Sequence, residues 1–195
     1  MELQHFNVKL LVKDDIDLEL LIPIFHGWIQ DKAFEEQLLD IADYRHVHDG
    51  PGVILIGLEG DYSVDNTDGR LGVRYNRKAG LNGSNRDRLT QATRAALSAC
   101  QRLEAEASLG GKLRFDGQAA EVFVNDRLLA PNHEATRAAA EPEFKSFFDN
   151  LFHGSEYSLA FDSDPRRLFA VSTKASHPFS VSSLLQNLSA KPVSR

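Results

Sequence analysis

A pattern of two strand-like segments followed by a helix-like segment recurs three times after residue 53, and it limits the possible folds more than any other feature. In its first occurrence the apolar run Val53–Ile56 predicts a strand that is covered on both faces. The Asp-Gly step at 68–69 predicts a hairpin turn, and the alternating apolar positions of 71–75 predict a half-buried strand. A helix is expected over about 85–107, where apolar residues recur at helical spacing.

The second and third occurrences share this pattern but no residue-level repeat. In the second, strands around 113–115 and 120–124 flank an expected turn at Asp116-Gly117. A helical region follows over about 133–152, and Pro142 is expected to break it into two pieces. The third consists of strands around 157–161 and 168–171 and a short helix over about 179–188.

The first 52 residues add one strand and one helix. Alternating apolar residues predict a strand within 3–13, and a helical stripe begins at Leu21, with Pro23 in its first turn. A further apolar segment around Leu38–Ile41 is expected to lead back to the sheet. The sequence therefore predicts an α+β fold, in which a strand–helix unit and three hairpin–helix units form a mainly antiparallel sheet with helices packed on it.

Length and composition favour one domain over residues 1–195, with a frayed tail at 189–195. The only cysteine, Cys100, lies on the apolar stripe of the second expected helix, which indicates a buried structural thiol rather than a nucleophile. With no apolar run long enough to cross a bilayer and no secretory signal, we expect a soluble, cytoplasmic protein that does not act at a membrane. A net charge of −6 without an extended basic patch argues against nucleic acid as a partner.

The densest polar segment, residues 43–52, contains Asp43, His46 and His48 directly before the apolar strand. Imidazole and carboxylate groups are ligands for zinc, iron or manganese, so these three residues are the candidate metal ligands. We favour an exposed polar loop with no metal, and so expect no cofactor; a divalent metal held by these three residues is the alternative. His46 and His48, with Asp61, are also candidates for general acid–base catalysis, because imidazole titrates near neutral pH.

A second candidate site lies on the first predicted hairpin. Arg74 and Asn76 are two residues apart and project from the same side of their strand, while Asp61 and Tyr62 end the preceding strand. This group could bind a small carboxylate or phosphate. The alternative is a cross-strand ion pair between Asp61 and Arg74, with no ligand.

The sequence contains no nucleotide-binding loop, nucleophile elbow or paired-cysteine motif. We therefore expect a non-catalytic protein that binds a ligand or associates with itself, with a small anionic ligand or a second copy of the chain as partner. The alternative is a small-molecule enzyme, metal-assisted in one version, that uses the Asp43–Asp49 histidine loop together with Asp61 and Arg74.

Overall fold

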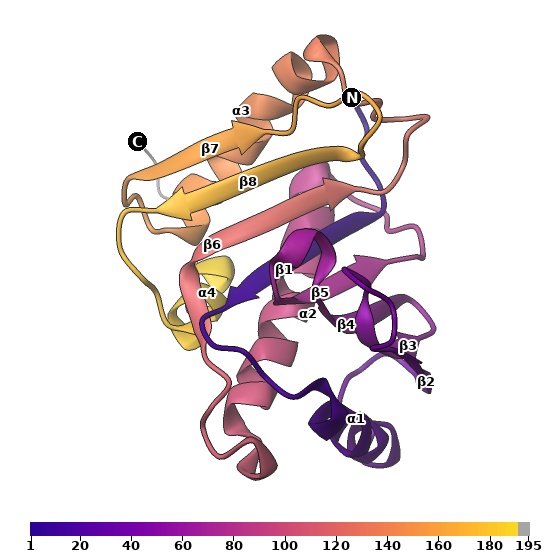
Figure 1. Cartoon of the computed structure of the whole chain (residues 1–195). Coiled ribbons are helices and arrows are strands. Elements are labelled where there is room, and N and C mark those ends of the chain that lie inside the picture. Colours follow the sequence, from indigo (N-terminus) through magenta and orange to yellow (C-terminus); the bar gives the residue numbers. More distant parts are fainter. Residues whose placement is uncertain (191–195) are drawn as a thin grey trace.

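The computed structural model of the chain describes residues 1–190 and shows one eight-stranded antiparallel sheet with four α-helices packed on it (Figure 1). The predicted α+β class is confirmed. The sheet order is β2-β3-β4-β5-β1-β6-β8-β7. The strands are β1 Phe6–Val12, β2 Leu38–Tyr44, β3 Gly52–Gly57, β4 Gly60–Asp65, β5 Gly72–Arg77, β6 Phe115–Val124, β7 Tyr157–Phe161 and β8 Phe169–Ala175. The helices are α1 Leu21–Gln30, α2 Asn85–Ala105, α3 Glu134–Leu151 and α4 Val181–Ser189.

Strands β2 to β5 form a four-stranded meander of sequence neighbours. The stretch from 53 to 62, read from sequence as one strand, is divided into β3 and β4 by a tight turn at Leu58-Glu59. Strand β1 lies between β5 and β6, so the N-terminal strand joins the meander to the C-terminal half of the sheet. The expected helical stripe from Leu21 and the placement of Pro23 in the first turn are both confirmed by α1.

The second predicted hairpin is wrong. Phe115–Val124 is a single strand, and its pairing with β1 shifts register between Leu10 and Val12. Gly117, in a left-handed conformation with φ of +63°, lies in this irregular stretch. The Asp-Gly step therefore kinks one strand as a bulge instead of reversing the chain, because the residues before it already pair with β1.

The expected break at Pro142 is also wrong, since α3 runs from Glu134 to Leu151 with Pro142 inside it. Pro142 has no N–H to donate to the carbonyl of Ala138. Both residues are exposed, so water can satisfy that carbonyl and the helix continues. The third hairpin, β7–β8, and the helix after it agree with the prediction.

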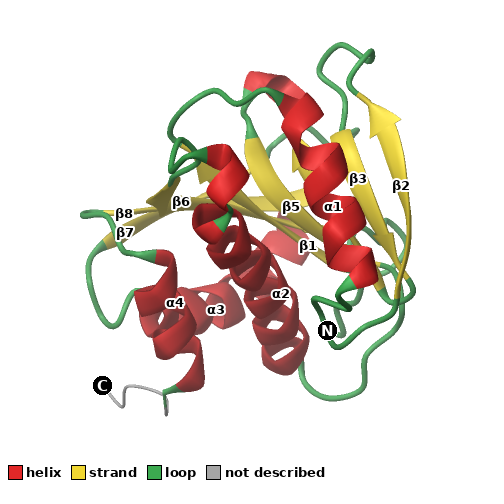
Figure 2. Ribbon diagram, turned by 90° about the horizontal axis from the view of Figure 1, so that it is seen from below, coloured by secondary structure: helices red, strands yellow, loops and turns green. Residues whose placement is uncertain are grey.

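The four helices cover one face of the sheet. Figure 2 shows α2, α3 and α4 together on one side of it, and α1 packs against β2 and β3 on that same side. The opposite face faces the viewer in Figure 1 and carries no α-helix of residues 1–190, only the short 3₁₀ turn Thr67–Gly69 in the β4–β5 loop. Accordingly Val53 and Leu55 are fully buried, whereas Ile54 and Ile56 are only half-buried, so the expectation that β3 is covered on both faces is wrong.

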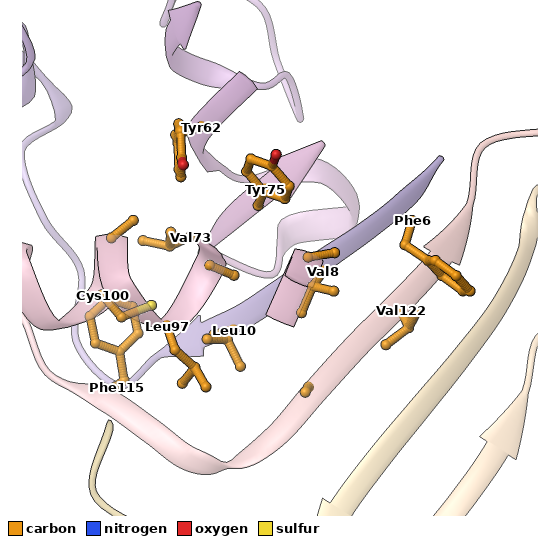
Figure 3. Close-up of a cluster of buried hydrophobic side chains, with 14 of the residues drawn as sticks. Phe6, Val8, Leu10, Tyr62, Val73, Tyr75, Leu97, Cys100, Phe115 and Val122 are labelled. Carbon is orange, nitrogen blue, oxygen red and sulfur yellow. The ribbon is translucent and has the colours of Figure 1, made fainter. Parts of the chain in front are cut away.

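The core lies between the sheet and α2, where Figure 3 shows apolar side chains of β1, β5 and β6 facing Leu97 and Cys100. Cys100 is fully buried, as predicted, and burial raises the pKa of its thiol well above the ordinary value. Within residues 1–190 no helix combines the length and the apolar character needed to cross a bilayer. Most of the tail expected to fray, residues 191–195, lies outside the described residues.

Candidate functional site

A cavity of about 450 Å³ lies between α2 and the chain segment that follows α1; we call it the α2 cavity. Its side on α2 consists of residues spaced at helical intervals, and its other side comes from the segment after α1 and from the β3–β4 turn. Tyr62 of β4, only 3% exposed, lines it where it meets the sheet. The lining residues are Ala33, Phe34, Glu35, Glu36, Glu59, Tyr62, Gln91, Arg94, Ala95, Ser98 and Arg102.

The orientation of α2 follows from its two stripes. Ser84 caps the helix through a capping box with Asp87, which fixes where it begins. Its apolar stripe, including Leu89, Ala96 and Cys100, is buried against the sheet. The neighbouring polar stripe then faces the segment after α1, and it carries the basic residues of the cavity.

Glu36 joins the cavity walls through three hydrogen bonds. The Tyr62 hydroxyl donates to Glu36 Oε1 at 2.7 Å. The backbone N–H groups of Glu59 and Gly60 donate to Glu36 Oε2 at 3.2 and 3.0 Å. The carboxylate thus ties the segment after α1 to the β3–β4 turn, and its role is structural.

Two tyrosines below the cavity stay protonated. Burial, followed by the hydrogen bond to Glu36, raises the pKa of Tyr62 far above its ordinary value. Burial also raises the pKa of Tyr75, whose hydroxyl accepts a hydrogen bond from Gln91 Nε2 at 3.3 Å. Figure 3 shows the two tyrosines side by side, with ring centroids 4.9 Å apart. Neither phenol can serve as a base at neutral pH.

Phe34 provides the aromatic part of the wall. Its ring stacks on Tyr62 with centroids 4.6 Å apart, and it meets the edge of Trp28 at 5.4 Å. The guanidinium of Arg102 lies 5.1 Å from the centre of the Phe34 ring, within the range of a cation–π contact.

The basic groups of the α2 cavity have few partners. Arg94, Ser98 and Arg102 follow one another at intervals of four residues, which places them on one face of α2. Within residues 1–190, Arg102 makes no ion pair and Arg94 makes only a 3.2 Å hydrogen bond to the hydroxyl of Ser189. Their remaining N–H groups are therefore free to bind a ligand.

The sheet separates the residues that the sequence grouped as an anion site. Tyr62 lines the α2 cavity, but Arg74 and Asn76 alternate with the inward-facing Tyr75 and so lie on the opposite face. Arg74 approaches Asp65 at 3.5 Å and lies 5.0 Å from the centre of the Phe123 ring.

The expected Asp61–Arg74 ion pair is wrong by two residues of register. Asp61 lies opposite Asn76, and Ser63 lies opposite Arg74. Asp61 instead pairs with Lys78 at 2.7 Å. An Asp61–Arg74 pair requires a turn centred between residues 67 and 68, whereas the turn from residue 66 to 71 is centred between Asp68 and Gly69.

The histidine loop joins β2 to β3. Asp43 forms a two-pronged interaction with Arg45, whose side-chain hydrogen bonds lower the Asp43 pKa to about 2. His46 is exposed near Tyr44, and the His48 side chain is 97% exposed beside Asp49. No group of three or more His, Cys, Asp or Glu side chains within residues 1–190 is arranged to hold a metal ion, so the structure does not bring the three proposed ligands together.

The structure also separates this loop from Asp61. The loop adjoins the end of β4, where the N–H of Asn66 donates to the carbonyl of Gly50 at 3.1 Å. Asp61 lies at the start of β4, opposite Ile56. The two parts of the proposed catalytic group are therefore at opposite ends of one strand.

Sequence reasoning did not identify Glu36, Arg94, Ser98 or Arg102. The four-residue spacing of the last three was a usable signal, because it predicts a polar stripe beside the apolar one. Nothing local to Glu36 marks it, since its partners lie 23 to 26 residues away. The chain matches no model of a known protein family and no curated protein.

Proposed function

We propose that this protein binds a small organic anion in the α2 cavity without transforming it chemically. The observation that carries the proposal is the row of Arg94, Ser98 and Arg102, which lines the cavity. Arg94 donates a hydrogen bond to Ser189 and the Arg102 guanidinium lies over Phe34, but neither arginine has a carboxylate partner within residues 1–190. The chain has more acidic than basic residues, so two arginines on one face of a helix without an acidic partner support an anion site.

The spacing suits a single anionic group. Four residues of helix advance about 6 Å, so Arg94 and Arg102 lie about equally far from Ser98 along the axis, on either side of it. A carboxylate or phosphate above Ser98 can accept a hydrogen bond from its hydroxyl and from both guanidiniums. Such charge-assisted bonds are shorter and stronger than neutral ones.

The rest of the ligand is expected to be apolar. Ala33, Phe34 and Ala95 line the same cavity and offer hydrocarbon surface. A site that combines apolar walls with a few convergent polar groups is the usual form of a small-molecule site.

The lining favours binding over catalysis. None of its residues is a histidine or a cysteine, and Tyr62 stays protonated. Glu36 already accepts three hydrogen bonds from the protein. Glu59 pairs with Arg77, and within residues 1–190 no hydrogen bond joins Glu35, the remaining carboxylate, to Ser98. Ser98 therefore has no hydrogen-bonded general base.

The test uses 3-phenylpropanoate, a carboxylate with an aromatic end, as the probe. The only tryptophan, Trp28, contacts Phe34, so its fluorescence reports on the cavity. We expect a saturable fluorescence change, an affinity that falls with ionic strength, and about tenfold weaker binding in Arg102→Gln, since a hydrogen bond to a charged group contributes about 1.5–3 kcal/mol.

Arg127→Gln is the matched control, because Arg127 is exposed and does not line the cavity. It should bind the probe like the wild type. Equal affinity in Arg102→Gln and wild type, or no saturable signal in either, would rule the proposal out.

A further inference from the structure

The two sides of the α2 cavity carry opposite charges that do not meet. Glu35, Glu36 and Glu59 lie on the side formed by the segment after α1 and the β3–β4 turn, and Arg94 and Arg102 lie on α2. Within residues 1–190, none of these acids forms an ion pair with either arginine. The two sides touch where the Arg102 guanidinium lies 5.1 Å from the centre of the Phe34 ring, but no ion pair closes the cavity of about 450 Å³, which has room for a small ligand.

Within residues 1–190, only one of the three carboxylates has no hydrogen-bond or ion-pair partner. Glu36 accepts hydrogen bonds from Tyr62 and the β3–β4 turn. Glu59 pairs with Arg77 at 2.7 Å. Glu35 is exposed and, within residues 1–190, makes no side-chain hydrogen bond or ion pair.

We infer that the ligand is a zwitterion of the α-amino acid type with an apolar side chain, an inference that rests on the proposed function. Its carboxylate lies above Ser98 between the two arginines, its ammonium group faces Glu35, and its side chain packs against Phe34. A ligand with only a negative charge would leave Glu35 without a partner and would be repelled by it. A zwitterion can form favourable charge interactions with both sides of the cavity, through its carboxylate with the arginines and through its ammonium group with Glu35.

The experiment compares three probes that share a phenylalanine-like skeleton. L-phenylalanine carries both charges, 3-phenylpropanoate lacks the ammonium group, and L-phenylalaninamide lacks the carboxylate. In the wild type we expect L-phenylalanine to bind about fivefold more tightly than 3-phenylpropanoate, the scale of an ion pair near a protein surface. L-phenylalaninamide should bind more weakly than L-phenylalanine, because its neutral amide offers the arginines no negative charge.

Glu35→Gln tests the assignment of the ammonium group. It should remove the preference for L-phenylalanine over 3-phenylpropanoate and leave the affinity for 3-phenylpropanoate equal to or above that of the wild type. Glu156→Gln makes the same change at an exposed glutamate outside the cavity and should keep the preference.

The outcomes separate this inference from the proposed function. If 3-phenylpropanoate binds and depends on Arg102, but L-phenylalanine binds no better, the zwitterion is excluded and the anion site stands. A preference that survives in Glu35→Gln overturns the role of Glu35. If no probe binds, or if L-phenylalaninamide binds as tightly as L-phenylalanine, the anion site and the zwitterion are both excluded.

Discussion

Glu36 connects segments that are distant in sequence through one carboxylate. Its two oxygens accept hydrogen bonds from the Tyr62 hydroxyl and from two backbone N–H groups of the β3–β4 turn. The same contacts place Phe34 against Tyr62, because Phe34 is only two residues away in the chain. The shape of the α2 cavity thus depends on a side chain that we expect to contact no ligand.

Glu36→Ala should lower the free energy of unfolding by about 2 kcal/mol or more, since it leaves partly buried donors without acceptors. Urea unfolding followed by Trp28 fluorescence measures the change. Glu35→Ala, one residue earlier and exposed, should change it by less than about 0.5 kcal/mol. Equal effects of the two substitutions would contradict the structural role of Glu36.

At the scale of elements, the irregularity in β6 shows that an Asp-Gly step can form either a hairpin turn or a bulge within one strand. Gly117 has a φ of +63°, and its carbonyl accepts a hydrogen bond from the N–H of Phe179 at 3.2 Å. A Cβ added at Gly117 would lie 1.8 Å from the carbonyl oxygen of Phe179. The bulge in β6 and the segment before α4 therefore fit together only with glycine at this position.

Gly117→Ala should destabilise the protein by about 3 kcal/mol or more, because the left-handed conformation costs about 1–2 kcal/mol for a residue with a Cβ and the clash with Phe179 adds to it. Gly111→Ala measures the cost of the left-handed conformation alone, since Gly111 has a φ of +71° and open space around its Cβ position. Thermal unfolding of both variants provides the comparison. A melting temperature for Gly117→Ala at or above that of Gly111→Ala would show that the segment before α4 moves aside easily.

At the scale of the whole molecule, β1 joins the two halves of the sheet, and a buried ion pair lies beside it. Lys9 of β1 and Asp65 at the end of β4 are each 2% exposed, and Lys9 Nζ lies 2.6 Å from Asp65 Oδ1. The β4–β5 loop forms further ion pairs over the face that carries no α-helix within residues 1–190, from Arg70 to Glu121 and from Asp68 to Arg167. Figure 1 shows this loop in front of the sheet.

Lys9→Met should cost about 3 kcal/mol, the lower end of the range for a broken buried ion pair, because Asp65 loses its close cation and keeps only Arg74 at 3.5 Å. That is a large part of the stability of an ordinary domain. Adding Asp65→Asn should recover part of the loss, since no net charge then stays buried. Lys174→Met, at an exposed lysine on the same face, is the control and should be nearly neutral.

Circular dichroism reports on the whole chain, and Trp28 fluorescence reports on its first half. Within each of the three variants, the two signals should give the same unfolding midpoint. Separate midpoints would show that the two halves of the sheet unfold independently.

Local signals in the sequence were sufficient for the element types and the fold class. The alternating strands, the helical stripes and the Ser84 cap of α2 depend on residues a few positions apart, so their patterns can be recognised in the sequence alone. The burial of Cys100 and the shared face of Arg74 and Asn76 follow from the same periodicities.

Contacts between distant segments decided the rest. Whether Asp116-Gly117 turns or bulges depends on the pairing of β6 with β1, and the partner of Arg74 depends on where the β4–β5 turn is centred. The candidate site depends on which face of the sheet the helices cover, since this separates Tyr62 from Arg74 and brings it to Glu36 and α2. Periodicity determines which side chains share a face, but only packing in three dimensions determines what that face meets.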